Sequence, residues 1–177
     1  MSAPTLSTPR LRLRAHVMAD LDALCDVFAD DRSAWMGGPL DRVSAWRWLA
    51  SEVGMWDLLG HGAWAVETRD GTFVGQVSLL QPPHYPECEL GWTLVASAEG
   101  QGYAQEAATA ALHWAWAQGR ETLVSYITPG NSRSIALAER LGATPDPDAP
   151  LPEGETPAET IVYRHRPDAD GSAEAYA

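Results

Sequence analysis

The sequence has no long apolar run. Nothing in its 177 residues approaches the roughly 18–20 consecutive apolar residues that a membrane-spanning helix needs. The first residues, MSAPTLSTPRLRLR, lack the apolar segment of a secretory signal. Its only two cysteines, Cys25 and Cys88, lie far apart in segments that we expect to be buried, which suits a reducing compartment better than a disulfide scaffold. We therefore expect a cytoplasmic protein that does not contact membrane.

Metal-ligand spacing and positive charge are also missing. The five histidines follow no ligand pattern, so we expect no metal site. The formal net charge of −12 argues against direct nucleic-acid binding, which needs a positive field. It would attract cationic substrates, although an acidic surface can equally serve solubility alone. Any anionic cofactor must be held by local donors.

What the sequence does contain indicates one globular domain. Hydrophobic residues make up 45% of the chain, and eight are tryptophan, so it can bury an ordinary core. Strand-like and helical patterns alternate along it. We expect strands at Arg10–Arg14, Glu87–Val95, Thr122–Thr128 and Thr160–Arg166, a hairpin from Ala63 turning at Asp70-Gly71, and helices at Asp20–Asp30, from about Asp41, from about Tyr103, and at Asn131–Gly142.

Three details of these elements are specific predictions. Asp20 is a possible N-cap of its helix, and Asn131 caps the last helix. The strand at Thr160–Arg166 closes the sheet, and the polar tail over residues 167–177 is flexible. The proline- and acid-rich stretch ATPDPDAPLPEGETPAE, residues 143–159, is either a functional loop or a disordered one.

The segment AEGQGYAQEAATAALHWAW, Ala98–Trp116, places a Gly-x-Gly pair directly before a helix. Gly100 and Gly102 allow backbone amides to turn toward an anion, and the helix adds its unpaired N-terminal amides and positive dipole end. No lysine follows, as a P-loop requires, and Gln105 replaces the third glycine of a dinucleotide fingerprint. The pattern fits a diphosphate site, but a plain turn is equally compatible.

The helix after this loop has one face of small side chains. This face lets the helix axis lie close to a sheet and hold the loop rigidly, although an ordinary core helix would show the same face. It is formed by Ala104, Ala108, Ala111, Leu112 and Ala115.

The segment ELGWTLVASAEGQGYAQEA resembles the acetyl-CoA-binding motif of the GNAT superfamily of N-acetyltransferases, with its signature [Q/R]-x-x-G-x-[G/A]. Three further segments resemble, in order, the branch that acetylates ribosomal-protein N-termini: TPRLRLR, VGQVSL and NSRSIALAERLGA. The resemblance covers residues 8–166. The cofactor-binding positions that it implies in the loop are Glu99, Gly100, Gln101, Gly102, Tyr103 and Ala104.

The resemblance implies a single α/β (α+β) domain over residues 8–166 with the GNAT fold. Its sheet would be mixed and mostly antiparallel, with six to seven strands, a V-shaped splay and about four helices. It implies direct, acetyl-CoA-dependent acetylation of a primary amine, either a protein N-terminal α-amine or a small amine. The alternatives are a catalytically silent acyl-CoA-binding module, or an interaction protein whose glycine loop is only a turn.

Two positions depart from the family pattern. Glu99 stands where the signature has Gln or Arg, which puts a carboxylate near the expected pyrophosphate. Ala138 stands where many members have a tyrosine as general acid. In the branch that this chain resembles, a serine has that role, and Ser134 matches it.

Amine acetylation needs a base, because primary amines are mostly protonated at neutral pH. Strand alternation puts Glu87 and Glu89 on one face, where mutual repulsion would raise a pKa. We assign Glu89 as the base, directly or through a water. A solvated acidic strand end is the alternative.

Other roles are assigned around this strand. A backbone amide at Leu94 or Val95 would polarise the acetyl carbonyl. The resemblance implies that Asn131 binds the pantetheine arm and that Ser134 protonates the departing thiolate, although a first-turn serine often bonds only to backbone. Tyr126 is a second candidate acid. Trp46 and Trp48 cannot both face the core, and exposed aromatic residues are compatible with a homodimer.

Overall fold

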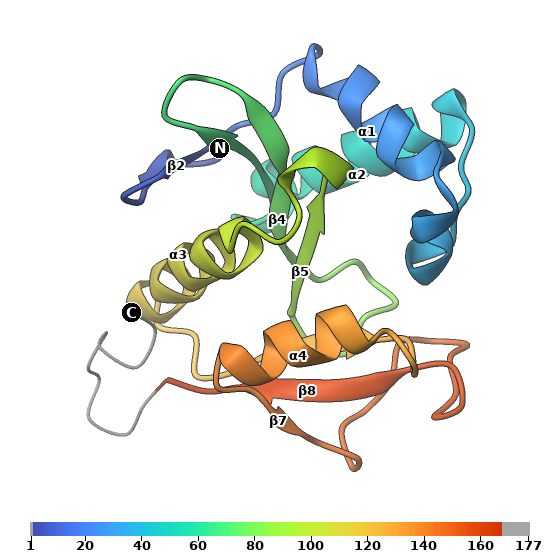
Figure 1. Ribbon diagram of the computed structural model, residues 1–177. Coiled ribbons are helices and arrows are strands. Elements are labelled where there is room, and N and C mark those ends of the chain that lie inside the picture. The colour runs from blue at the N-terminus through green and yellow to red at the C-terminus, as the bar shows by residue number, and fades with distance from the viewer. Residues whose placement is uncertain (1, 168–177) are drawn as a thin grey trace.

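The computed structural model describes residues 2–167, so the predicted tail lies outside the described residues apart from Pro167. One sheet runs through the molecule in the order β1-β2-β3-β4-β5-β6-β8-β7. All neighbouring strands are antiparallel except β5 and β6, which are parallel. In Figure 1, α3 and α4 lie in front of the sheet, while α1 and α2 lie together at the upper right. The predicted mixed, mostly antiparallel sheet is confirmed.

The described residues form eight strands, four α-helices and two short 3₁₀-helices. The strands are β1 Leu6–Ser7, β2 Leu11–Arg14, β3 Ala63–Thr68, β4 Phe73–Leu80, β5 Glu89–Leu94, β6 Leu123–Ile127, β7 Thr144–Pro145 and β8 Ile161–His165. The helices are α1 Asp20–Ala29, η1 Asp31–Met36, α2 Arg42–Leu59, η2 Ala96–Ala98, α3 Tyr103–Ala117 and α4 Ser132–Arg140. None of these helices is long and apolar enough to cross a bilayer.

The strand count exceeds the predicted six to seven because β1 and β7 have only two residues each. Such strands are too short to show a period of two. β7 pairs with β8 through Thr144 opposite Arg164, so the prediction that β8 closes the sheet was wrong. β7 lies within the 143–159 stretch, which is further held by hydrogen bonds from the Asp146 amide to the Val162 carbonyl and from the Glu153 amide to the His84 carbonyl, both 2.9 Å.

Local capping explains the start of α2 but not that of α1. The Asp41 side chain accepts from the Ser44 amide at 2.8 Å, which fixes the start of α2. Asp20, however, is the first residue of α1 and not its N-cap. Its buried carboxylate accepts from both terminal nitrogens of Arg14, at 2.9 Å each, and from the Val17 amide. A tertiary ion pair has therefore replaced the predicted cap.

The small-residue face of α3 packs as predicted. Ala108, Ala111, Leu112 and Ala115 are completely buried, and α3 contacts β2, β4 and β5. Three tryptophans continue this core in edge-to-face contact, Trp56, Trp64 and Trp114, with ring centroids 4.6–5.6 Å apart. Such pairs add stability beyond the area they bury. The helix that follows the glycine loop is thus rigidly held.

A second apolar cluster joins α1 and α2. It contains Leu24, Phe28 and Leu49, with Trp48 edge-to-face on Phe28 at 4.6 Å. Trp46 is 44% exposed on the other side of α2, so the two tryptophans diverge as their spacing predicts.

Candidate active site

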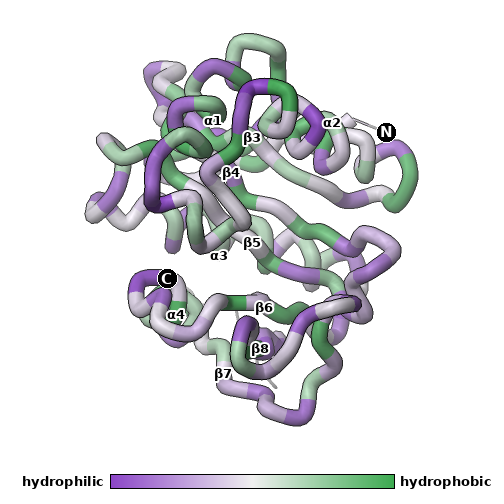
Figure 2. Tube along the Cα trace, turned by 90° about the vertical axis from the view of Figure 1, so that its right-hand side faces the viewer, coloured by the Kyte–Doolittle hydropathy of each residue, from purple (hydrophilic) through white to green (hydrophobic). Residues whose placement is uncertain are grey.

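The parallel pair β5–β6 is the point at which the sheet divides. Its only registered pair is Glu89 opposite Val124, with the Val124 amide donating to the Cys88 carbonyl at 3.0 Å. One residue further, the Ser125 hydroxyl donates to the Leu90 carbonyl at 2.7 Å and lies 3.0 Å from His165 Nε2. A side chain thus replaces the backbone ladder where the strands separate. In Figure 2, β6, β8, β7 and α4 form one group, and β3, β4, β5 and α1–α3 form the other. This is the expected splay.

The two predicted carbonyl-polarising amides differ in availability. The Val95 amide donates to the Val74 carbonyl on β4 at 3.0 Å and is therefore occupied. Antiparallel hydrogen bonding alternates along a strand, so the Leu94 amide points away from β4, toward the side on which β5 and β6 separate. Of the two, Leu94 is the candidate donor.

The loop after β5 has the conformation that its glycines allow. Gly100 and Gly102 both have left-handed backbones, with φ of 74° and 78°, which residues with a side chain rarely adopt. Gly102 is the N-cap of α3 and supplies no side-chain cap. The first-turn amides, including those of Tyr103 and Ala104, thus have no capping side chain and can donate to an anion.

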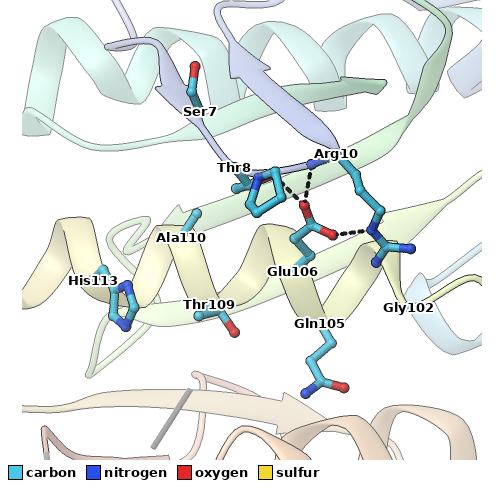
Figure 3. Close-up of a pocket in the computed structure, with 10 residues that line it drawn as sticks. Ser7, Thr8, Arg10, Gly102, Gln105, Glu106, Thr109, Ala110 and His113 are labelled. Carbon is cyan, nitrogen blue, oxygen red and sulfur yellow. Dashed lines mark hydrogen bonds and ion pairs between the residues drawn. The ribbon is translucent and has the colours of Figure 1, made fainter. Parts of the chain in front are cut away.

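Arg10 braces the outer side of this loop. Its guanidinium donates to the Gln101 carbonyl at 2.8 Å, pairs with Glu106 at 2.6 Å, and lies 4.9 Å from the centre of the Tyr103 ring. Figure 3 shows the Arg10–Glu106 pair. Beside it, between the β1–β2 segment and α3, lies a hollow of about 540 Å³. Only Gly102 of the glycine loop lines it, and none of the predicted catalytic residues does. The hollow therefore adjoins the glycine loop at Gly102 but does not reach the predicted catalytic residues.

Glu99 does not face the loop as an isolated charge. Its carboxylate pairs with Arg133 of α4 at 2.7 Å and also with Arg32 of η1. These three side chains come from segments that are far apart in the sequence. The negative charge of Glu99, at the first signature position, is thus compensated by ion pairs. The two guanidinium groups lie beside the position expected for the diphosphate.

Burial raises the pKa of Glu89 to about 8, opposed by a hydrogen bond from the Tyr126 backbone and aided by the charge of Glu155. The upward direction agrees with the prediction, but its cause does not. Glu87 forms a two-pronged ion pair with Arg164 at 2.6 and 2.7 Å, so its charge is already compensated. Desolvation, and not repulsion between Glu87 and Glu89, therefore raises the pKa of Glu89.

Tyr126 lies beside this base. Its ring packs edge-to-face on Tyr85, with centroids 5.4 Å apart. Its hydroxyl is buried beside the Glu87 backbone, and burial raises the pKa of Tyr126 to about 12. The structure therefore brings Glu89 and Tyr126 together and keeps the Tyr126 phenol protonated at neutral pH.

Ser134 and Asn131 lie at the start of α4. The Asn131 side-chain oxygen accepts from the Ser134 amide at 3.2 Å, which confirms Asn131 as the helix cap. The neighbouring Arg133 reaches Glu99, so this helix start and the glycine loop lie close together. The start of α4, which carries Ser134, is thus on the cofactor-loop side of the site.

Two buried polar residues of this region, Glu52 and Gln76, were not predicted from the sequence. Glu52 is only 3% exposed, and its Oε2 accepts from Gln76 Nε2 at 2.6 Å. Burial raises the pKa of Glu52 to about 8, with a further contribution from the charge of Glu89. A signal was present, because Glu52 continues the helical spacing of the buried residues Ala45 and Leu49.

Comparison with known proteins identifies a family. Residues 10–144 match the family model described as an acetyltransferase (GNAT) domain. The uncharacterized protein YkkB of Bacillus subtilis (strain 168) is 30% identical over 149 residues, covering 80% of this chain and 87% of that protein. An acetyltransferase from Agrobacterium tumefaciens str. C58 has 43% identity and a TM-score of 0.87 over 94% of this chain and 96% of that one. The ribosomal α-N-protein acetyltransferase RimL, solved with coenzyme A, shares the fold at 17% identity, with a TM-score of 0.71 over 96% and 100% of the two chains.

Proposed function

The chain belongs to the GNAT acetyltransferase family, and on that premise we propose that it transfers an acetyl group directly from acetyl-CoA to a primary amine. The observation that carries this proposal is the arrangement along β5. A carboxyl group whose pKa burial raises to about 8 begins the strand at Glu89, and the glycine loop follows the strand's other end. The proposed base and the proposed anion-binding loop therefore lie at the two ends of the same strand, β5.

The residues of the loop fit a diphosphate. The uncapped amides at Tyr103 and Ala104 supply donors, and the left-handed glycines keep the approach to them free of side chains. Arg32 and Arg133 supply positive charge against the acidic net charge of the protein. We propose that these groups hold the diphosphate, with the Asn131 side chain and the Leu94 amide contacting the pantetheine arm and the acetyl carbonyl. The bound donor supplies an activated thioester.

The proposed chemistry divides between the two sides of the splay. Glu89 accepts a proton from the acceptor ammonium or from the attacking amine, directly or through a water. The Leu94 amide stabilises the carbonyl oxygen while the nitrogen–carbon bond forms and the carbon–sulfur bond breaks. Ser134 gives a proton to the departing sulfur and regains one from solvent. Tyr126, the second candidate acid, lies beside Glu89 and is better placed to contact the amine.

An acceptor screen tests this proposal. Free thiol is measured after acetyl-CoA is mixed with peptides, polyamines, amino acids and aminoglycosides, and we expect release with at least one class. Stabilisation by acetyl-CoA without thiol release would instead identify a silent binding module. A ligand present at a hundred times its Kd raises the free energy of unfolding by about 2.7 kcal/mol. If acetyl-CoA does not change the unfolding temperature, the interaction-protein alternative is supported.

The cellular setting completes the proposal. Cys25 and Cys88 are free thiols, which supports a reducing compartment such as the cytoplasm. Trp35, Trp46 and Leu58 are exposed apolar residues, which supports a homodimer. Fractionation of cells and light scattering of the purified protein test the two points separately. The acceptor itself is a protein N-terminus or a small amine.

A further inference from the structure

Glu52 is a buried carboxyl group without a cation. It lies on the face of α2 that packs against the sheet, and among the described residues no arginine or histidine forms an ion pair with it. Its side-chain hydrogen bond comes from the neutral carboxamide of Gln76, at 2.6 Å. Buried acids are normally paired with a cation, because desolvation makes the isolated charge costly. Burial accordingly raises the pKa of Glu52 to about 8, so the free carboxyl group is mostly protonated at neutral pH, and a cation bound beside it would allow it to ionise.

Gln76 has an unused acceptor at the same place. The residue is 2% exposed, and its Oε1 is buried without a hydrogen-bond partner. Since Nε2 donates to Glu52, Oε1 is left to accept from another group. A buried carbonyl oxygen without a donor costs free energy, so this second observation points independently to a missing hydrogen-bond donor.

Strand register places this pair on the same face as Glu89. Gln76 is opposite Thr93, and Leu80 is opposite Glu89. Because side chains alternate along strands, Gln76, Thr93 and Glu89 share one face. Between them lie Gly91, which has no side chain, and the small side chain of Ser78 opposite it. The charge of Glu89 acts on Glu52, which shows that the carboxyl groups are within electrostatic reach of each other.

We propose that Glu52 and Gln76 form an acceptor subsite that binds a second cationic group, so that the preferred acceptor is a diamine. This inference rests on the proposed acetyltransferase function. The reacting amine lies at Glu89, and the second ammonium donates to the Glu52 carboxylate and to Gln76 Oε1. One ligand group thereby supplies both the missing cation and the missing donor. Glu52 is a specificity residue and takes no part in the acetyl transfer.

The test compares linear diamines with monoamines of equal chain length in the wild type and in Glu52→Gln. We expect the wild type to have a lower KM for the diamine. In Glu52→Gln, the KM for the diamine should rise at least about tenfold, with kcat nearly unchanged, because a desolvated charge pair is lost. The KM for the monoamine should stay the same. Glu52→Asp, which keeps the charge, should recover part of the loss.

Glu121→Gln is the matched control, because it removes one exposed acidic charge far along the sequence from this face and should leave both KM values unchanged. Equal KM values for diamine and monoamine in the wild type, or a diamine KM unaffected by Glu52→Gln, would overturn the subsite. If no amine is acetylated, the proposed function fails. In that case, thermal stabilisation by the diamine decides the subsite: a shift present in the wild type and lost in Glu52→Gln supports it, and the absence of a shift in the wild type refutes it.

Discussion

The pH dependence of acetyl transfer tests the role of Glu89 directly. A general base works only when ionised, and burial raises the pKa of Glu89 to about 8. The ionised fraction therefore grows as pH rises, from about one in eleven at pH 7 to about ten in eleven at pH 9. If Glu89 is the base, kcat/KM should rise about tenfold across this range because of this group alone.

The acceptor amine titrates in the same range, so two acceptors are needed to separate the effects. A peptide α-amine has a pKa of about 7.7–8.0 and a lysine-type amine one of about 10.4. Thiol release is measured for each acceptor from pH 5.5 to 10. The limb that moves with the acceptor belongs to the amine, whereas the limb near pH 8 that both profiles share belongs to the enzyme.

Substitution assigns the shared limb. Glu89→Gln keeps the shape of the side chain but cannot take a proton, so kcat should fall by about 10²–10⁴ and the shared limb should disappear. Acetyl-CoA affinity should stay nearly constant, because Glu89 lies at the opposite end of β5 from the glycine loop. A shared limb near pH 4.5, or a wild-type rate in Glu89→Gln, would refute the reasoning.

Three further predictions concern the cofactor loop, the acid and the sheet. Glu99→Gln should tighten acetyl-CoA binding about two- to fivefold at low ionic strength, and by less at high salt, since it removes an exposed negative charge; calorimetric titration checks this, and weaker binding would contradict it. Ser134→Ala should lower kcat with an unchanged acceptor KM, whereas Tyr126→Phe should mainly raise the acceptor KM; the reverse pattern in steady-state kinetics would exchange the two roles. Gly75→Ala should destabilise the fold by about 3 kcal/mol, because Gly75 has a φ of 147° and an added Cβ would lie 2.1 Å from a β5 carbonyl oxygen. In thermal unfolding, Gly54→Ala is its control: the added Cβ meets nothing within 4 Å inside α2, and this change should be neutral or stabilise by up to about 1 kcal/mol.

Features fixed by neighbours in the sequence could be predicted. The Asp70-Gly71 turn between β3 and β4, the Asn131 cap and the two left-handed glycines each depend on a few adjacent residues, and the structure has all of them. The exposed Trp46 and the partly buried Trp48 follow from helical spacing in the same way. Periodicity therefore located every element longer than three residues except η1.

Charge pairing could not be predicted, because it joins distant segments. Glu87 meets Arg164 across 77 positions, and Glu99 meets Arg32 across 67 and Arg133 across 34. The Glu87–Arg164 pair removes the repulsion from Glu87 that was expected to raise the pKa of Glu89. The Glu99 pairs compensate the carboxylate at the first signature position. Only the folded sheet brings these partners together, and no local pattern encodes them.

The Glu99 pairs bear on the release of product as well as on binding. Coenzyme A keeps its phosphates after it has lost the acetyl group, so the spent donor would hold the same guanidiniums as the fresh one. A carboxylate already attached to the loop can reclaim Arg32 and Arg133 as the phosphates leave. Glu99 would thus compete with the phosphates for the two arginines and shorten the time for which coenzyme A stays bound. A glutamate at this position, where the family has Gln or Arg, would lower the affinity for the cofactor but speed its release and so raise turnover.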